Sequence, residues 1–395
     1  MSARPILFDA THTSHTSAQT GIQRVCRTFF NELCATGPVT PVCYDPHLIG
    51  WRPLRKDETA VLRDQSGGAG KSRGAKWTLR QKLTGAGARW LGRKPTLPEA
   101  AGLICPELFS AKVGARLPEL LVRTAGPRVA IFYDAIALKF PELTPAGTVA
   151  RFPAYLRELL VFDGIAAISE DSAVALRDYW KWLGVAAVPP VHAIPLAIDR
   201  SLTEPHAAPT SSDVPRILCV CTIEGRKNHL ALLEACESLW AGGLKFELQL
   251  IGMPRPDTAG AALARIASLQ QAGRPVIFPG AVPEAELHAA YRGCAFTVYP
   301  SIIEGFGMPV LESLQHGKPC ICSGRGALGE SAHGGGCVPL DTVDAATLAA
   351  AVRRLLEHPA DLAALADAAR ARWLKSWPDY AAEFTGWMQS LHRRS

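Results

Sequence analysis

Two series of apolar, strand-like runs that alternate with helical runs constrain the fold of this chain more than any other feature. Runs rich in β-branched and aromatic residues are typical of buried strands, whereas apolar residues three or four positions apart predict helices. The first series has predicted strands at 5–10, 128–136 and 164–170 and predicted helices at about 22–34, 152–160 and 171–183. The second series has predicted strands at 216–223, 246–252, 275–281, 295–301 and 319–323. This alternation predicts an α/β chain with two doubly wound domains.

A polar, proline-containing stretch at 197–216 separates the two series. Because 395 residues exceed one ordinary domain, we predict an N-terminal Rossmann-like domain at 1–200 and a linker at 201–215. A C-terminal Rossmann-like domain should follow at 216–375, and a helix at 376–395 should return to the N-terminal domain. Doubly wound domains bind ligands outside the carboxyl ends of their strands, so we expect the two domains to face a ligand cleft there.

The composition is that of a globular protein, with 48% hydrophobic and 20% charged residues. No run approaches the roughly 20 apolar residues that a membrane-spanning helix needs. The first residues resemble a strand more than a signal peptide, so we expect a cytoplasmic protein.

The chain has eleven cysteines, an odd number without the spacing of a disulfide framework, which fits reduced thiols. Cys219 with Cys221, and Cys320 with Cys322, form C-x-C pairs inside predicted strands. Zinc sites more often use C-x2-C pairs in loops, so we interpret these cysteines as small buried hydrophobic residues. We predict no metal and no cofactor.

The segment 299–321 predicts a strand, a glycine-containing loop and then a helix with Pro309 in its first turn. Such a helix start is an anion site, because its free N–H groups and positive dipole end point above the strand. Glu304 in the loop and Glu312 in the helix would repel a phosphate, so we expect them to accept hydrogen bonds from the hydroxyls of a ribose or sugar. Alternatively, both are ordinary surface glutamates.

Arg226 and Lys227 stand at the start of a predicted helix that follows the strand at 216–223. A planar guanidinium and a compact ammonium there are suited to neutralising a diphosphate. A solvated pair of cations is the alternative. Another glycine motif, G-x-G-x-x-G at 324–329, should not open a helix, which argues against a dinucleotide site.

The N-terminal domain offers four candidate residues at its predicted ligand edge. Gly21 lies at a helix start, where it could let the backbone approach a phosphate or an acceptor. Asp134, Ser169 and Glu170 follow predicted strands, and each could instead be a cap or turn residue.

Together, TIEGRKN (222–228) and PSIIEGFGMPVLE (300–312) resemble the retaining glycosyltransferases of family 4, which have the GT-B fold. The resemblance covers nearly the whole chain. It implies that Arg226 and Lys227 hold the diphosphate of a nucleotide-sugar donor, that Glu312 holds the ribose, and that Glu304 holds the transferred sugar. The backbone of Gly305, Phe306 and Gly307 would assist Glu304.

The resemblance also implies a catalytic role for Asp134 and independence from divalent metal, and the chain has no Asp-x-Asp. Tyr133 stands where many relatives have a histidine, so the group that orients the acceptor or contacts the sugar is open; Ser169 and Glu170 are the other candidates.

The implied activity is transfer of a sugar, with mannose from GDP-mannose as the first hypothesis, to a saccharide or lipid-linked glycan in bacterial surface polysaccharide synthesis. The departing phosphate could itself take the acceptor's proton, so no protein nucleophile is required. A nucleotide-sugar 2-epimerase of the same fold and a catalytically impaired nucleotide-sugar-binding relative are the alternatives.

A basic insertion at about 52–94 has twelve Lys or Arg residues and three acidic ones. From 76 to 94 it has no acid and includes Trp77, Leu79, Leu83, Trp90 and Leu91. We expect residues 71–95 to bind an anionic membrane surface, which places the protein at the inner face of the membrane as a peripheral protein. Gly85 and Gly87 should interrupt any helix here. No nucleic-acid-binding motif accompanies the segment, and a solvated loop is the alternative.

Overall fold

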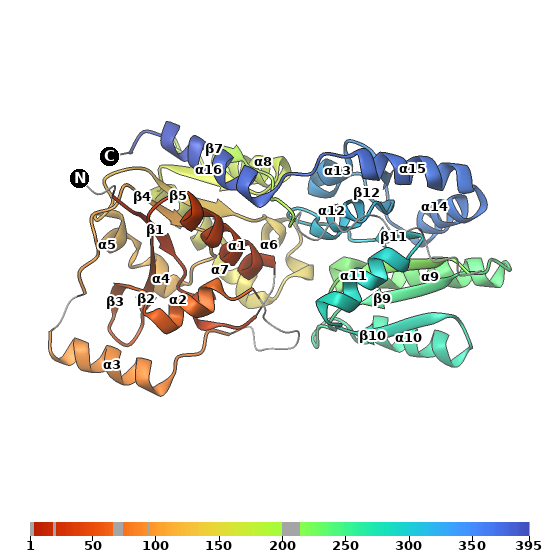
Figure 1. Cartoon of the computed structure of the whole chain (residues 1–395), viewed down its shortest axis with the longest axis horizontal. Coiled ribbons are helices and arrows are strands. Elements are labelled where there is room, and N and C mark those ends of the chain that lie inside the picture. Colours follow the sequence, from red (N-terminus) through yellow and green to blue (C-terminus); the bar gives the residue numbers. More distant parts are fainter. Residues whose placement is uncertain (1–3, 19–20, 66–73, 93–94, 200–213, 395) are drawn as a thin grey trace. The chain divides into compact units, whose positions relative to one another are not determined.

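The computed structural model describes residues 4–18, 21–65, 74–92, 95–199 and 214–394. The chain forms two compact units: unit 1 comprises Met1–Leu196 and Trp377–Ser395, and unit 2 comprises Ala197–Ser376. Each unit has one predominantly parallel β-sheet with helices around it (Figure 1). The predicted α/β class with two doubly wound domains is therefore confirmed.

The sheet of unit 1 has seven strands in the order β3-β2-β1-β4-β5-β6-β7. Neighbouring strands are parallel except β2 and β3, which are antiparallel. The strands are β1 (Ile6–Asp9), β2 (Val39–Asp45), β3 (Gly50–Pro53), β4 (Gly102–Cys105), β5 (Arg128–Phe132), β6 (Gly164–Ala167) and β7 (Val191–Ala193). Sequence analysis did not predict β2, β3, β4 or β7.

The helices of unit 1 come from both of its chain segments. They are α1 (Gly21–Thr36), α2 (Lys56–Arg63), α3 (Leu79–Trp90), α4 (Ala111–Gly114), α5 (Leu117–Leu121), α6 (Ile136–Lys139), α7 (Ala146–Glu158), α8 (Glu170–Trp182) and α16 (Trp377–Ser390).

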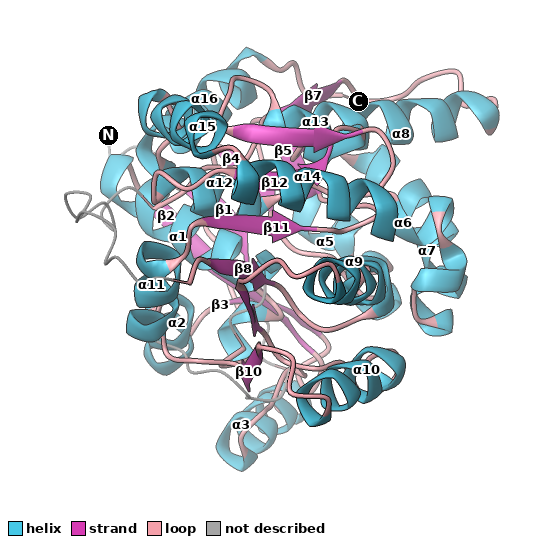
Figure 2. Ribbon diagram, turned by 90° about the vertical axis from the view of Figure 1, so that its right-hand side faces the viewer, coloured by secondary structure: helices cyan, strands magenta, loops and turns pink. Residues whose placement is uncertain are grey.

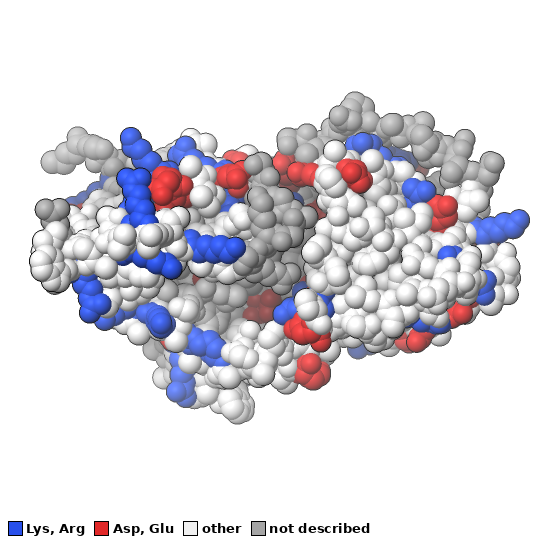
Figure 3. All heavy atoms as spheres, turned by 90° about the horizontal axis from the view of Figure 1, so that it is seen from below, with Lys and Arg blue, Asp and Glu red and all other residues white. Residues whose placement is uncertain are grey.

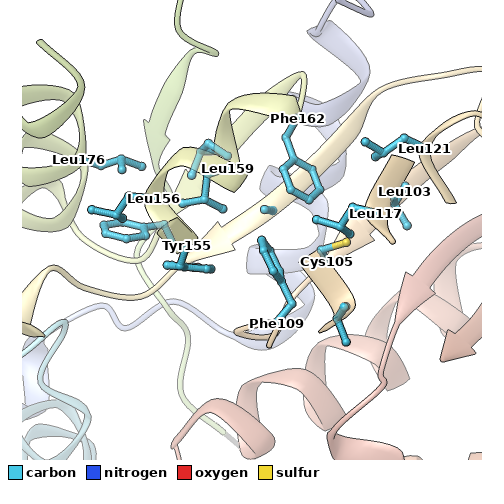
Figure 4. Close-up of a cluster of buried hydrophobic side chains, with 14 of the residues drawn as sticks. Leu103, Cys105, Phe109, Leu117, Leu121, Tyr155, Leu156, Leu159, Phe162 and Leu176 are labelled. Atoms are coloured by element: carbon cyan, nitrogen blue, oxygen red, sulfur yellow. The ribbon is translucent and has the colours of Figure 1, made fainter. Parts of the chain in front are cut away.

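Both faces of this sheet are buried. Successive strand residues point to opposite sides, so each face contributes side chains to its own core. On one side, Phe8 of β1 packs against Phe30 of α1, with ring centroids 5.3 Å apart. On the other side, Leu7 belongs to a core that includes residues of α5 and α7. Figure 4 shows part of that core, where Phe109 lies between Tyr155 and Phe162 at centroid distances of 5.1 and 6.3 Å.

Helix α16 completes the first of these faces although it lies at the other end of the chain. Tyr380 and Phe384 pack edge-on against Phe29 of α1 at 5.2 and 4.8 Å. A Cβ added to Gly102 of β4 would lie 2.3 Å from Cε of Met388, so this helix rests directly on the strand. The core of unit 1 is thus incomplete without α16.

Unit 2 has a six-stranded parallel sheet in the order β10-β9-β8-β11-β12-β13. Its strands are β8 (Arg216–Val220), β9 (Glu247–Ile251), β10 (Val276–Gly280), β11 (Phe296–Tyr299), β12 (Cys320–Ser323) and β13 (Cys337–Leu340). Its helices are α9 (His229–Ala241), α10 (Gly260–Gln271), α11 (Glu284–Gly293), α12 (Met308–Gln315), α13 (Gly326–Ala332), α14 (Ala345–Glu357) and α15 (Pro359–Ala371). Helix α9 packs against α10 and α14, and α11 lies on the other side of the strands (Figure 2).

Arg52, the first residue of the predicted basic insertion, lies in β3 with its side chain buried. Two predictions about local structure were wrong. Helix α13 begins within the G-x-G-x-x-G segment, where no helix was expected. Helix α3 is continuous through Gly85 and Gly87. The reason at Gly85 is close packing, since a Cβ there would lie 2.9 Å from Cβ of His47.

A buried polar network attaches the segment before and within α3 to unit 1. The guanidinium of Arg52 donates to Asp45 at 2.8 Å and to both carboxylate oxygens of Glu58 at 2.6 Å. Gln81 of α3 also donates to Glu58, at 3.0 Å, and Trp77 stacks on His15 at 3.7 Å. Charges buried in this way are tolerated because each has an opposite charge or a hydrogen bond.

Among the residues that the structure describes, no helix combines the length and the hydropathy needed to cross a bilayer.

Candidate functional site

The candidate site of unit 2 lies where the strand order of its sheet reverses. Strands β8 and β11 are parallel neighbours, and the chain continues from β8 toward β10 and from β11 toward β13. The loops after β8 and β11 therefore leave from the same sheet edge, beside each other. In doubly wound sheets this reversal point is where ligands bind.

The loop after β8 carries both predicted cations in a short 3-10 helix, Gly225–Lys227. Asn228 follows with a left-handed φ of 55°, which asparagine tolerates better than most residues, and α9 begins at His229. The amide of Asn228 donates to the backbone oxygen of Val343 at 2.8 Å, which holds this turn in place.

The loop after β11 leads into α12, which has proline in its first turn as predicted. Gly307 caps this helix with a φ of 128°, a backbone conformation that favours glycine. A Cβ on Gly307 would also lie 3.0 Å from side-chain atoms of Leu328 and Ser331. Ser331 donates to the backbone oxygen of Phe306 at 2.9 Å, so α13 supports the Gly305–Gly307 turn.

Backbone contacts join the two loops. The N–H of Ile302 donates to the backbone oxygen of Arg226 at 2.9 Å, and the hydroxyl oxygen of Ser301 lies 3.2 Å from the same oxygen. The position of Arg226 is therefore fixed relative to the loop that carries Glu304.

The carboxylate of Glu304 binds both cations. Its Oε2 accepts from Arg226 at 2.6 Å, and its Oε1 accepts from the ammonium of Lys227. The hydroxyls of Tyr299, at 2.9 Å, and of Ser301 also donate to Oε1. The side chains of Lys227 and Glu304 are only 8% and 10% exposed. The structure thus brings together Arg226, Lys227 and Glu304, which we call the ion cluster.

Glu224 extends the ion cluster beyond Arg226. Its Oε1 lies 2.8 Å from Nε of Arg226, and its Oε2 lies 3.1 Å from the guanidinium of Arg255. Arg226 is consequently held between two carboxylates. Burial would lower the pKa of Arg226, but the charges of Glu304 and Glu224 raise it above its ordinary value.

Glu304 is ionised at neutral pH. Burial alone would raise the pKa of Glu304, but the charges of Lys227 and Arg226, with hydrogen bonds from Lys227 and Ser301, outweigh it and hold this pKa at about 2. An ionised carboxylate only accepts hydrogen bonds. Glu304 is therefore suited to binding hydroxyls or cations and not to donating a proton.

Glu312 lies in α12 and is not part of the ion cluster. The hydroxyl of Tyr291 donates to its Oε2 at 3.2 Å. Gly305 and Phe306 are buried beneath the helix start. The predicted contact of Glu312 with a ribose stays a prediction.

In unit 1, Asp134 directly follows β5 and Tyr133, and it accepts from the N–H of Ile136 at 2.9 Å. The Tyr133 ring is buried, and its hydroxyl donates to the backbone oxygen of Pro106 at 2.7 Å. The ring position is therefore fixed by the protein interior.

The other predicted residues of unit 1 have different surroundings. Ser169 is buried and caps α8 by accepting from the N–H of Ser172 at 3.2 Å. Glu170 is exposed and pairs with Arg177. Gly21 is the first residue of α1, and a Cβ there would have no neighbour within 4 Å. Their predicted roles toward a donor or acceptor stay predictions.

Sequence analysis missed three partners in the ion cluster, Glu224, Tyr299 and Ser301. Each of the three lies in or directly beside one of the two motifs. Their positions at the ends of predicted strands were the signal that could have identified them. It also missed two buried carboxylates at the end of β1 and after β4, Asp9 and Glu107. Burial and the charge of Glu107 raise the pKa of Asp9 to about 7.

Comparison with known proteins gives a family domain and a fold. A family model described as "Glycosyl transferases group 1" matches residues 214–358. A serotype-specific mannosyltransferase, WbdA of Escherichia coli, is 23% identical over 342 residues, which is 80% of this chain and 38% of that protein. An MMP α-(1→4)-mannosyltransferase of Mycolicibacterium hassiacum is 31% identical over 198 residues, 49% of this chain and 46% of that protein. The chain spans less than half the length of these curated relatives.

Two solved structures resemble the whole chain. Sucrose-phosphate synthase from Thermosynechococcus elongatus has a TM-score of 0.67 at 20% identity, with 97% of this chain and 98% of that chain covered. Anabaena HepE in complex with UDP-glucose has a TM-score of 0.68 at 16% identity, with 98% and 100% covered. At this identity the likeness shows the fold, which is GT-B.

Proposed function

We propose that this chain, which has the GT-B fold and carries a domain of the glycosyl transferases group 1 family, is a retaining glycosyltransferase. In this proposal it moves a sugar from a nucleotide-sugar donor to a saccharide or lipid-linked glycan. The ion cluster is the observation that carries the proposal, because two cations meet at the reversal point of the sheet, beside a helix start.

The cluster explains how the chain would assist transfer. As the glycosidic bond to the donor phosphate breaks, negative charge grows on the diphosphate, and in this proposal Arg226 and Lys227 stabilise it. A phosphate oxygen could take the acceptor's proton on the same face of the sugar, which would retain the anomeric configuration. Glu304 is an ionised hydrogen-bond acceptor. It would bind hydroxyls of the transferred sugar once the diphosphate binds Arg226 and Lys227, which pair with Glu304 in this structure.

Mannose from GDP-mannose is the proposed donor, and the two mannosyltransferases described above support it. A bacterial surface polysaccharide is the proposed product. The HepE complex contains UDP-glucose, so UDP-sugars are the competing donor class.

Thermal shift across nucleotide sugars, followed by a transfer assay, tests the donor. We expect GDP and GDP-mannose to raise Tm more than UDP and UDP-glucose at equal concentration, because a bound ligand stabilises the folded state. When an acceptor is added, GDP should be released, and NMR should show that the transferred sugar keeps its α configuration in the product. No shift with any nucleotide would contradict donor binding. An epimerised nucleotide sugar formed without acceptor would instead identify a 2-epimerase.

We also propose that α3 attaches unit 1 to an anionic membrane surface at the inner face of the membrane. At 100° per residue, Leu79, Leu83 and Trp90 fall within about 40° of one another on one face of this helix. Their side chains are 72%, 65% and 87% exposed. Gln81 and Gly85 are buried on the opposite face.

Charge favours a membrane as the partner. Arg80, Lys82 and Arg89 lie on α3, which has no acidic residue. Figure 3 shows the molecule from below, the side on which α3 lies in Figure 1. In the left half of that view, which includes α3, Lys and Arg predominate over Asp and Glu. Each such cation near an anionic surface contributes on the order of 1 kcal/mol. Of the segment 71–95, residues 71–73 and 93–94 lie outside the described residues.

Sedimentation with phosphatidylglycerol-containing vesicles checks this proposal. We expect binding at low salt that weakens at high salt, and a loss of at least about tenfold in the double variant Leu83→Asp, Trp90→Asp, because two apolar side chains leave the membrane. Trp373→Asp, a change at a 66% exposed tryptophan in unit 2, is the control and should bind like the wild type. Equal binding by the double variant, or none by the wild type at low salt, would contradict the proposal.

A further inference from the structure

Three metal-ligating side chains meet beneath the loop that carries Arg226 and Lys227. Cys219 lies in β8, Cys221 follows two residues later, and His229 is the first residue of α9. All three are buried. Alternate strand residues point to the same side, so both thiols face the start of the helix that packs over them.

Two of the three distances among these groups match the edges of a tetrahedral zinc site, and the third is below 4.8 Å. The two sulfur atoms are 3.8 Å apart, and Sγ of Cys221 is 3.4 Å from Nε2 of His229. All three ligand atoms lie within 4.8 Å of one another. With Zn–S bonds of about 2.3 Å and Zn–N bonds of about 2.0 Å, tetrahedral angles give edges of about 3.8 Å between sulfurs and about 3.5 Å between sulfur and nitrogen.

Protein groups leave these ligands available. Both cysteines are free thiols. Nε2 of His229 contacts Sγ of Cys221, and Nδ1 has no hydrogen-bond partner among the described residues.

The other cluster of this kind among the described residues differs. His15, Cys43 and Glu58 also lie within 4.8 Å of one another, but Arg52 already binds both oxygens of that carboxylate. A cation there would have to displace a buried guanidinium. The comparison favours the cysteine cluster.

We propose that Cys219, Cys221 and His229 bind a zinc-class divalent cation, which we call the β8–α9 metal site. Two thiolates balance the charge of the ion, and an imidazole nitrogen completes a three-residue ligand set that zinc accepts. The metal has no part in the transfer chemistry proposed above. This proposal departs from the sequence interpretation, which treated the two cysteines as hydrophobic residues, because the contribution of His229 was not visible in the C-x-C spacing.

A disulfide fits the same pair less well. Residues two apart in a strand have Cα atoms about 6.6–6.8 Å apart, at the upper limit for a disulfide. A metal needs no closer approach than the observed 3.8 Å between sulfurs.

The site would join the two ends of the loop 222–228. Cys221 precedes this loop and His229 follows it, so a bound ion would fix the loop that presents Arg226 and Lys227. Binding of metal does not depend on the proposed function. A second effect, tighter binding of GDP in the metal-loaded protein, does rest on it.

Cobalt titration of the full chain, reduced and freed of metal, tests the site directly. We expect one Co²⁺ per chain with the near-ultraviolet charge-transfer band of a cobalt–thiolate bond and the visible bands of tetrahedral cobalt, both removed by Zn²⁺. Cys221→Ser and His229→Asn should weaken cobalt binding by at least about tenfold. Cys236→Ser, a buried cysteine elsewhere in α9, should leave it unchanged.

Two further measurements do not depend on how well the variants fold. In the wild type, Zn²⁺ should protect Cys219 and Cys221 from alkylation, as read by peptide mass, and should raise Tm by roughly 5–10 °C at a hundredfold excess over Kd. Absence of a thiolate band in the wild type, equal loss in Cys236→Ser, or a Cys219–Cys221 disulfide after purification under reducing conditions would overturn the site. Normal cobalt binding without any response to GDP would instead count against the proposed function.

Discussion

Lys227→Met should lower kcat/KM for sugar transfer by about 10² to 10³, the effect of removing one preorganised charge from the leaving group. The ammonium of Lys227 is nearly buried and is held by Glu304 and by the hydroxyl of Tyr299. Methionine keeps most of the apolar stem but not the charge, so the affinity for GDP should fall as well. Initial rates and calorimetric titration with GDP measure the two effects.

Lys318→Met is the matched control for that variant. Lys318 is also a partly buried lysine of unit 2, but its ammonium donates to the backbone oxygen of Cys294 and not to the ion cluster. Stability should fall in both variants, whereas only Lys227→Met should lose transfer. Normal turnover in Lys227→Met would remove the ion cluster from the active site.

Glu304→Gln should reduce kcat by about 10² or more and leave GDP binding unchanged or tighter. The carboxylate is bound to the same two cations that a diphosphate would use, so its neutralisation frees them for the nucleotide, while one of the two oxygens that accept from sugar hydroxyls becomes an amide donor. In contrast, Glu312→Gln should mainly weaken GDP, since the ribose is its proposed partner. Equal losses of GDP affinity in the two variants would contradict this division of roles.

The Glu304→Gln substitution should also change how the stability of the protein depends on pH. The pKa of Glu304 is lowered from 4.5 to about 2 in the folded protein, so its stabilising effect is present above pH 4.5 and lost as the pH falls toward 2. Near neutral pH the Gln variant should unfold about 1–3 kcal/mol more easily, because two buried cations lose their counter-ion. This difference should shrink steadily between pH 4.5 and 2 in denaturant titrations, and a constant difference would mean that Glu304 is not ionically paired.

Unit 2 was the more predictable half of the fold. Its buried parallel strands have continuous apolar runs, and strong turn residues such as Gly305 and Pro309 mark where α12 starts. Strand β13, with Pro339 inside it and glycines before it, lacks such a run and was missed. Local signals therefore located five strands of this sheet, including the edge strand β10, but not the other edge strand, β13.

Unit 1 was harder to predict because charge and burial coincide there. Strand β3 contains Arg52, and a charged residue argues against a buried strand unless its partners are known. Its partners, Asp45 and Glu58, belong to other elements. The continuity of α3 depends likewise on the contact of Gly85 with His47, 38 positions away in the sequence.

The ion cluster shows what sequence can and cannot supply for a site. The motifs singled out Arg226, Lys227 and Glu304 separately, because each stands at a strand end or helix start. Their pairing requires β8 and β11 to be neighbours, although the chain between these strands forms two other strands first. Only the strand order reveals that both predicted phosphate ligands form salt bridges with the predicted sugar ligand.

The position of α16 has a consequence for how the chain is made. Residues Ala197–Ser376 emerge from the ribosome before the helix that covers Phe29 and rests on Gly102 of β4. At 5–20 residues per second, unit 1 waits roughly 10–40 s with that surface uncovered. Unit 2, by contrast, is contiguous and can fold as soon as it is out. The half of the protein that is synthesised first is thus the last to be completed, and during translation its exposed aromatic surface is the part that a chaperone would recognise.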